Sequence, residues 1–208
     1  MGNLNLILFI SIVAPLAMML LIYKGKSRTS LLFLLLGILV CLFCGEFSSL
    51  VMQQLPFDRR FFTVNFTPLF EEIFKAFPIL VYSFLYKPKR QTLFESSIAV
   101  GVGFAILENA FILASDISQV SILLALIRGF GSGMMHGVCT LAVGYGMTFV
   151  YKRRKLFYTG TTALLSAAII YHSVYNNLVQ SEYQIIGFLL PIVTFLPLVA
   201  VLRKKGII

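Results

Sequence analysis

Long apolar runs separated by short polar segments make up almost the whole chain. The runs cover about residues 4–23, 30–53, 67–86, 95–115, 121–151, 156–179 and 184–202. Each is about as long as an α-helix must be to cross the hydrocarbon core of a bilayer, roughly 20 residues, or longer. The pattern therefore predicts an all-α membrane protein, a single domain over residues 1–208 formed by a bundle of about seven transmembrane helices.

The composition agrees with this pattern. Of the 208 residues, 59% are hydrophobic and only 12% are charged, whereas soluble domains contain about 25% charged residues. A net charge of +9 in a soluble protein would suggest a nucleic-acid partner. Here the basic residues are confined to short clusters between apolar runs, which excludes nucleic acid and indicates topological signals. We expect a multi-pass protein of the cell membrane, in contact with lipid.

The basic clusters also predict the orientation of the chain. Thirteen of the 17 Lys and Arg residues lie in four clusters, which begin at Lys24, Lys87, Lys152 and Arg203. These clusters follow the first, third, fifth and seventh apolar runs. Because loops rich in Lys and Arg stay in the cytoplasm, we predict that the N-terminus lies outside and the C-terminus lies in the cytoplasm.

The third apolar run, residues 67–86, carries three charged side chains: Glu71, Glu72 and Lys75. Each charge in hydrocarbon costs at least about 2.5–3.5 kcal/mol on insertion scales, so a run that only anchored the protein would avoid them. A spacing of four places Glu71 and Lys75 on one helix face, where they can pair. Glu72 points about 100° away and can face a different helix.

Other runs carry polar side chains at a similar depth. We counted residues from each basic cluster at 1.5 Å per residue, which places these groups roughly 20–27 Å into the membrane. In a core about 30 Å thick they share one layer below the outer boundary. The layer comprises Glu46, Glu71, Glu108, His136 and His172. The same count places Arg128 at about 36 Å, beyond the core.

This polar layer has the side chains needed for hydrolysis. Its carboxylates cannot all be ionised in a poorly hydrated site, so one glutamate can take a proton from a water molecule. A divalent cation is the alternative means of neutralising the site, and two histidines with one glutamate would suit Zn²⁺. The ligands would then be Glu108, His136 and His172. No His-Glu-x-x-His motif marks them, so no metal or other cofactor is assigned.

Two other classes of protein use intramembrane polar groups. A transporter or proton channel would carry them across the full depth of the membrane, whereas the inner halves of these runs nearly lack them. A non-catalytic membrane scaffold would keep the cluster only to hold its helices together.

Four short motifs on separate runs resemble a known family. They are Glu71-Glu72-Ile-Phe-Lys75, Gly103-Phe104-Ala-Ile-Leu-Glu108-Asn109, Arg128 followed by His136, and His172-Ser-Val-Tyr-Asn176. In this order, over about residues 67–180, they resemble the PrsW family of bacterial intramembrane proteases. More distantly they resemble the type II CAAX prenyl endopeptidases of the CPBP family. Those enzymes have Phe-x-x-x-His where Phe104 here leads to Glu108, which argues against a prenylated substrate.

The resemblance implies a protease-like domain that cleaves a single-pass membrane protein, such as an anti-sigma factor, at site 1. It implies a catalytic set that comprises Glu71, Glu72, Glu108, His136 and His172. Lys75, Arg128 and Asn109 are expected to support this set, and Lys75 with Glu72 would tune the proton affinity of Glu71.

The polar layer and the resemblance together lead to a mechanistic hypothesis. Glu71 acts as the general base for a water molecule, and either His136 or Glu108 assists proton transfer to the leaving amine. His172 and Asn176 donate hydrogen bonds to the developing oxyanion, an interaction worth ~3–4 kcal/mol per donor when well placed. Because the layer is near the outer boundary, we expect the scissile bond at the extracytoplasmic face.

Overall fold

The computed structural model describes residues 2–20, 28–115, 121–150, 153–204 and 206. Its helices are α1 (Gly2–Leu20), α2 (Arg28–Gln54), α3 (Arg59–Asn65), α4 (Thr67–Tyr86), α5 (Arg90–Ser115), α6 (Ile122–Leu126), the π-helix η1 (Ile127–Ser132), α7 (Gly133–Met147), α8 (Arg154–Val179) and α9 (Gln184–Lys204). No strand occurs within these ranges. The prediction of an all-α protein is confirmed.

Each of the seven apolar runs contains one long helical segment in the described ranges. The fifth consists of α6, η1 and α7, which follow one another without a gap from Ile122 to Met147. Four segments are long and apolar enough to span a membrane: α2, α5, the α6–α7 segment and α9. The chain is therefore a multi-pass membrane protein. The number of seven crossings and the compartment of each terminus stay predictions.

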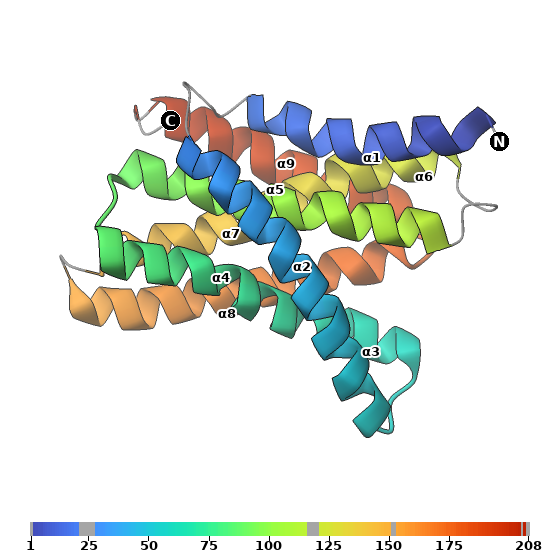
Figure 1. Ribbon diagram of the computed structural model, residues 1–208, viewed down its shortest axis with the longest axis horizontal. Coiled ribbons are helices and arrows are strands. Elements are labelled where there is room, and N and C mark those ends of the chain that lie inside the picture. The colour runs from blue at the N-terminus through green and yellow to red at the C-terminus, as the bar shows by residue number, and fades with distance from the viewer. Residues whose placement is uncertain (1, 21–27, 116–120, 151–152, 205, 207–208) are drawn as a thin grey trace.

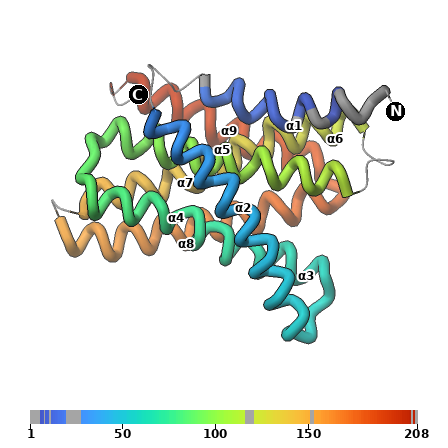
Figure 2. The backbone as a smooth tube through the Cα atoms, in the orientation of Figure 1, coloured from blue at the N-terminus to red at the C-terminus, as the bar shows by residue number. Residues whose placement is uncertain are grey.

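The long helices run roughly along the long axis of the molecule, except that α2 crosses the bundle obliquely (Figure 1). The end of α2 and the short helix α3 project from one side. Helix α1 starts at one end of the long axis and α9 finishes toward the other, as Figure 2 also shows.

Local sequence signals set several helix ends. The side chain of Asp58 caps α3 by accepting a hydrogen bond from the backbone N–H of Phe61 (2.9 Å). Pro68 lies in the first turn of α4, where its missing N–H has no helical partner to lose. At the other end of α4, Lys87 adopts a left-handed conformation (φ 47°), and Pro88 follows it. A proline there prevents the helix from continuing.

Helix α5 lies at the centre of the packing. Its residues Ile98, Ala99, Val100 and Val102 are completely buried. Glycines allow its neighbours to approach to backbone contact, the small-residue packing typical of membrane helices. A Cβ atom at Gly103 would fall on the carbonyl oxygen of Leu34 in α2.

The glycine contact between α2 and α5 yields a stability prediction. Gly103→Ala forces a Cβ atom into the Leu34 carbonyl, and overpacking of this kind costs about 1–3 kcal/mol. We expect the melting temperature of the detergent-purified protein to fall by roughly 2–12 °C. Gly45→Ala is the matched control, because a Cβ atom at Gly45 meets nothing within 4 Å. Equal melting temperatures for the two variants would contradict the close packing.

Candidate functional site

Six ionisable side chains from four helices meet inside the bundle. We call this group the polar cluster. It consists of Glu71, Glu72 and Lys75 from α4, Glu108 from α5, His136 from α7 and His172 from α8. All are buried except Glu108, whose side chain is 16% exposed. The sequence-predicted catalytic residues are thus brought together in space, while their roles stay predictions.

Lys75 lies at the centre of the polar cluster and is completely buried. Its Nζ donates to Glu72 Oε1 at 2.6 Å and to His136 Nδ1 at 2.6 Å. The ammonium also lies 4.7 Å from the centre of the Phe104 ring, a favourable cation–π distance. The spacing also allowed Lys75 to pair with Glu71. Spacings of three and four both share a helix face, and here the i,i+3 partner Glu72 makes the ion pair.

The contacts of the two histidines indicate which ring nitrogen carries a proton. His136 Nδ1 accepts from Lys75, so its Nε2 carries the proton and donates to Glu108 Oε2 at 3.1 Å. His172 Nδ1 donates to Glu72 Oε1 at 2.8 Å, which leaves its Nε2 unprotonated. The two rings meet edge to face, with their centres 4.8 Å apart.

Glu108 is held by donors from the fifth helical segment. Its Oε2 accepts from Arg128 Nη2 at 3.4 Å and from Ser132 Oγ at 3.3 Å, in addition to His136. Asn109 fixes Arg128 by accepting from its Nε (3.3 Å) and by donating to its backbone carbonyl (2.9 Å). Arg128 and Asn109, expected as supporting residues, therefore contact the polar cluster directly or through one residue.

The depth count did not predict the contact between Arg128 and Glu108. It placed Arg128 beyond the core and eight residues above His136, yet both side chains reach the same carboxylate oxygen. Arg128 and Ser132 lie in η1, whose π-helical turns change the rise and the facing of the residues relative to an α-helix. Such π-segments occur frequently at functional sites. No pattern in the sequence marked this one, and Ser132 was missed for that reason.

Two residues expected near the polar cluster make no direct hydrogen bond to it among the described residues. Asn176 is half-buried and lies one turn after His172. Glu46 is exposed on α2, where it lines a cavity together with Glu71 and Glu108. Tyr175, which the sequence did not single out, is 1% exposed, and its hydroxyl has no hydrogen-bond partner in the described part of the chain.

A cavity of about 340 Å³ leads to the polar cluster between α2, α4 and α5. Glu71 and Glu108 form part of its wall, and Gly45 and Phe111 line it from exposed positions on α2 and α5. Aromatic edge contacts join α2 to α4 beside it, with ring centres 4.9 Å apart for Phe43 and Phe74. The exposed lining of α2 and α5 therefore offers the approach to the cluster.

The side chains of the polar cluster also fit a metal ion. Glu71, His136 and His172 each offer a ligand atom, and these atoms lie within 4.8 Å of one another. Glu71 Oε2 and His172 Nε2 are buried without hydrogen-bond partners among the described residues, and they are 3.6 Å apart. Two ligands of a tetrahedral Zn²⁺, each about 2.1 Å from it, would be about 3.4 Å apart. A cation between the two atoms would relieve the repulsion of their lone pairs.

This ligand set differs from the one predicted. The sequence suggested Glu108 with the two histidines, whereas the structure groups Glu71 with them. Glu108 Oε2 is already engaged by Arg128, Ser132 and His136. Glu72 supports the Glu71 set, because it accepts from Nδ1 of His172. This is the carboxylate–histidine pairing that commonly orients a metal-binding imidazole.

The comparisons with known proteins give one match. The model of the family described as PrsW family intramembrane metalloprotease matches residues 26–202, a wider range than the motif region of about 67–180. Neither the curated proteins nor the solved structures gave a match.

The charge arrangement predicts that replacing Glu72 destabilises the protein far more than replacing the adjacent Glu71. Glu72→Gln leaves the Lys75 ammonium buried without its counter-charge, which costs about 3–5 kcal/mol when a buried pair is broken. Glu71→Gln removes a carboxylate that accepts no hydrogen bond from the described residues, and it is expected to lower the melting temperature little or to raise it. Thermal unfolding of the two purified variants in detergent measures this. A larger loss for Glu71→Gln would contradict the assigned ion pair.

Proposed function

This chain belongs to the PrsW family of intramembrane metalloproteases, and from this membership we propose that it cleaves a membrane-anchored protein at the polar cluster. The observation that carries the proposal is the buried convergence of Glu71, His136 and His172. They lie beside a cavity that also reaches Glu108. A transporter or a scaffold does not need such a ligand set next to an accessible cavity.

We propose Glu71, His136 and His172 as the residues that hold a divalent metal ion. When bound there, Zn²⁺ would polarise the scissile carbonyl and lower the pKa of a bound water. Glu72 holds the Nδ1 proton of His172 and so keeps Nε2 directed at Glu71. Lys75 balances the charge of Glu72 and fixes the His136 ring through Nδ1.

Glu108 is proposed as the proton carrier. Its Oε2 accepts a hydrogen bond from His136 Nε2 at 3.1 Å, which orients the carboxylate to take a proton from the attacking water and later give it to the leaving amine. Arg128 and Ser132 hold this carboxylate in place. Because Glu108 also lines the cavity, it can exchange a proton with a substrate there.

His172, expected with Asn176 as an oxyanion donor, gives its one N–H to Glu72, so the donor is proposed among the residues that follow it. Asn176 keeps the role expected from the sequence, since its amide makes no hydrogen bond to the polar cluster among the described residues. Tyr175 is a second candidate, because its buried hydroxyl lacks a partner in the described part of the chain. Either side chain would supply a neutral donor in a site with little water.

A metal-free mechanism is the alternative version of the same activity. In it, the Glu71 carboxylate would act as general base for a water, 3.6 Å from His172 Nε2. The hydrogen bond from His136 Nε2 to Glu108 favours this version, since that nitrogen must lose its proton before it binds a metal.

The substrate is proposed to be a single-pass membrane protein, such as the anti-sigma factors suggested by the family resemblance. We infer from the predicted seven crossings, with the N-terminus outside, that the polar cluster lies below the extracytoplasmic face, and cleavage is expected there. The substrate segment would lie in the cavity between α2 and α5. Gly45 leaves that cavity open, because a Cβ atom placed at this position would meet no atom within 4 Å.

Cleavage of a tagged single-pass substrate by the purified protein tests the activity. We expect that a chelator abolishes cleavage and that added Zn²⁺ restores it, and that Glu71→Gln lowers the rate at least about 100-fold. Glu46→Gln is the control, since Glu46 lines the same cavity from an exposed position. Cleavage that resists chelation but not Glu71→Gln would support the metal-free mechanism. A fully active Glu71→Gln variant would refute the site.

Access through the cavity can be tested at a glycine. Gly45→Leu adds a side chain to the wall without meeting the backbone, so we expect normal stability and at least ~10-fold slower cleavage of the single-pass substrate. Gly160→Leu on α8 is the matched control, because a Cβ there makes only ordinary contact with Leu156 (3.6 Å) and lies outside the cavity lining. Unchanged cleavage by folded Gly45→Leu would show that the substrate approaches elsewhere.

A further inference from the structure

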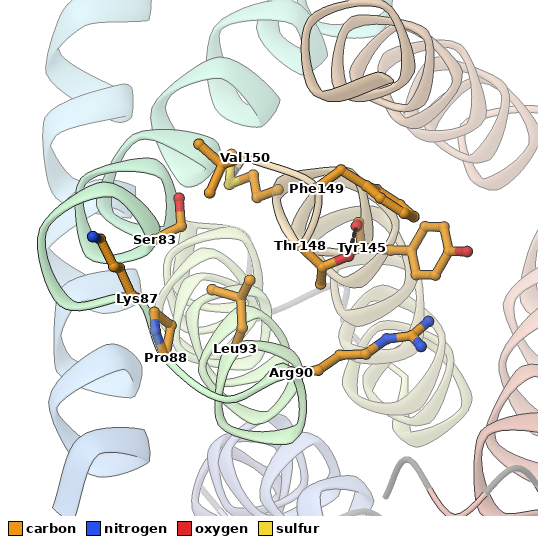
Figure 3. A pocket seen from close by; sticks show the side chains of 10 residues that line it. Ser83, Lys87, Pro88, Arg90, Leu93, Tyr145, Thr148, Phe149 and Val150 are labelled. Atoms are coloured by element: carbon orange, nitrogen blue, oxygen red, sulfur yellow. Dashed lines mark hydrogen bonds between the residues drawn. The ribbon is translucent and has the colours of Figure 1, made fainter. Parts of the chain in front are cut away.

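A second cavity, of about 480 Å³, lies where α4 ends, α5 begins and α7 ends (Figure 3). Its lining includes Ser83, Lys87, Arg90, Leu93, Tyr145 and Thr148. We call it the basic cavity. Lys87 follows Lys75 by 12 residues, or about 18 Å along the chain direction of α4, so this cavity is separate from the polar cluster.

Positive charge marks the basic cavity. Lys87 and Arg90 both line it and are exposed, and Lys89 lies between them in the sequence. None of its described lining residues is acidic. The nearest acidic residue on α5, Glu95, accepts a hydrogen bond from Gln91 (3.0 Å) and lies outside the lining. The cavity is therefore suited to an anionic group.

The guanidinium of Arg90 is held by two aromatic rings. It lies 5.1 Å from the centre of the Tyr145 ring and 5.2 Å from that of Phe94, within the range of cation–π attraction. Figure 3 shows the Arg90 side chain extending toward Tyr145 rather than toward Lys87. An exposed arginine that is stacked in this way has less side-chain freedom to lose when it binds an anion.

A third cavity, of about 310 Å³, shares Arg90 and Tyr145 with the basic cavity. The rest of its lining is apolar and comes from α5, α7, α8 and α9, including Phe94, Leu141, Leu164, Leu198 and Val201. We call it the apolar cavity. A cationic compartment and an apolar compartment thus meet at one stacked arginine. Both volumes are in the range of small-molecule sites, roughly 300–1,000 Å³.

We propose that the basic and apolar cavities together bind one anionic phospholipid. Its phosphate pairs with Arg90, because a guanidinium offers two parallel donors to phosphate oxygens, and Lys87 adds positive charge to the lining of the same cavity. One of its acyl chains lies along the apolar cavity. Basic pockets between transmembrane helices are suited to anionic lipid headgroups. A free phosphate would use only the basic cavity, so the apolar cavity favours a lipid.

Lipid titration of the purified protein in detergent tests the proposal, with the melting temperature and native mass spectrometry as readouts. We expect phosphatidylglycerol to bind and to raise the melting temperature, and phosphatidylcholine with the same chains to bind at least ~5-fold more weakly. Shortening the acyl chains should weaken binding, and glycerol 3-phosphate or inorganic phosphate should have no effect. Equal effects of the free phosphates and the lipid would overturn the lipid assignment.

Charge variants locate the site. Arg90→Gln should remove the preference for phosphatidylglycerol, whereas Arg90→Lys should keep most of it. Arg154→Gln is the matched control, because Arg154 is an exposed basic residue at the start of α8 that lines neither cavity. If Arg90→Gln does not fold, Lys87→Gln removes the other positive charge of the lining and should weaken the preference. An unchanged preference in the folded variant would overturn the proposal. Lipid binding is measured without substrate, so the outcome does not depend on proteolysis.

Discussion

The buried ammonium of Lys75 is the constraint on which the rest of the structure depends. A charge removed from water without a partner destabilises a protein strongly, so a buried lysine requires counter-charges and acceptors around it. Glu72 and His136 supply them at 2.6 Å. Because Glu72 also binds His172, one residue pair on α4 fixes the histidines of α7 and α8. The positions of the side chains in the polar cluster therefore follow from the need to pair the buried ammonium of Lys75.

Close packing of α5 provides the setting for this network. Gly103 brings α5 against the backbone of α2, and Gly101 brings it against α7, where a Cβ atom would lie 2.5 Å from the carbonyl oxygen of His136. Glu108 lies on α5, as these glycines do. They therefore fix the position of His136 relative to Glu108 along the bundle axis. Where α2 diverges from this contact, the space is the cavity that reaches Glu71 and Glu108.

Much of this arrangement follows from patterns in the sequence. The third apolar run, residues 67–86, coincides with α4, because length and hydrophobicity define a helix in a membrane. Polar residues at one depth on separate runs predicted a common site, since intramembrane charges must find one another. Neither the length and hydrophobicity of a run nor the depth of its polar residues depends on side-chain rotamers. These two properties identified every member of the polar cluster.

The contacts within the site could not be predicted in the same way. Helical spacing allows Lys75 to pair with Glu71 or with Glu72, and in the structure Lys75 and His172 both bind Oε1 of Glu72. The depth count assumed a uniform α-helical rise, which the π-helical segment at Arg128 does not follow. Glu71 rather than Glu108 joins the two histidines as a candidate metal ligand, because Glu108 is already bound by other donors. These donors come from three separate turns of one helical segment, which sequence spacing alone did not reveal.

The charges of α4 have a consequence for biogenesis. When α4 leaves the ribosome, Glu72 can already neutralise Lys75 within the helix, but His136 and His172 have not been synthesised. The translocon therefore receives a segment whose polar face has no complement, and α4 cannot be released into lipid alone as readily as α2 or α9. We therefore expect α4 to integrate stably only with α5, α7 and α8 beside it, because their side chains complete the polar cluster.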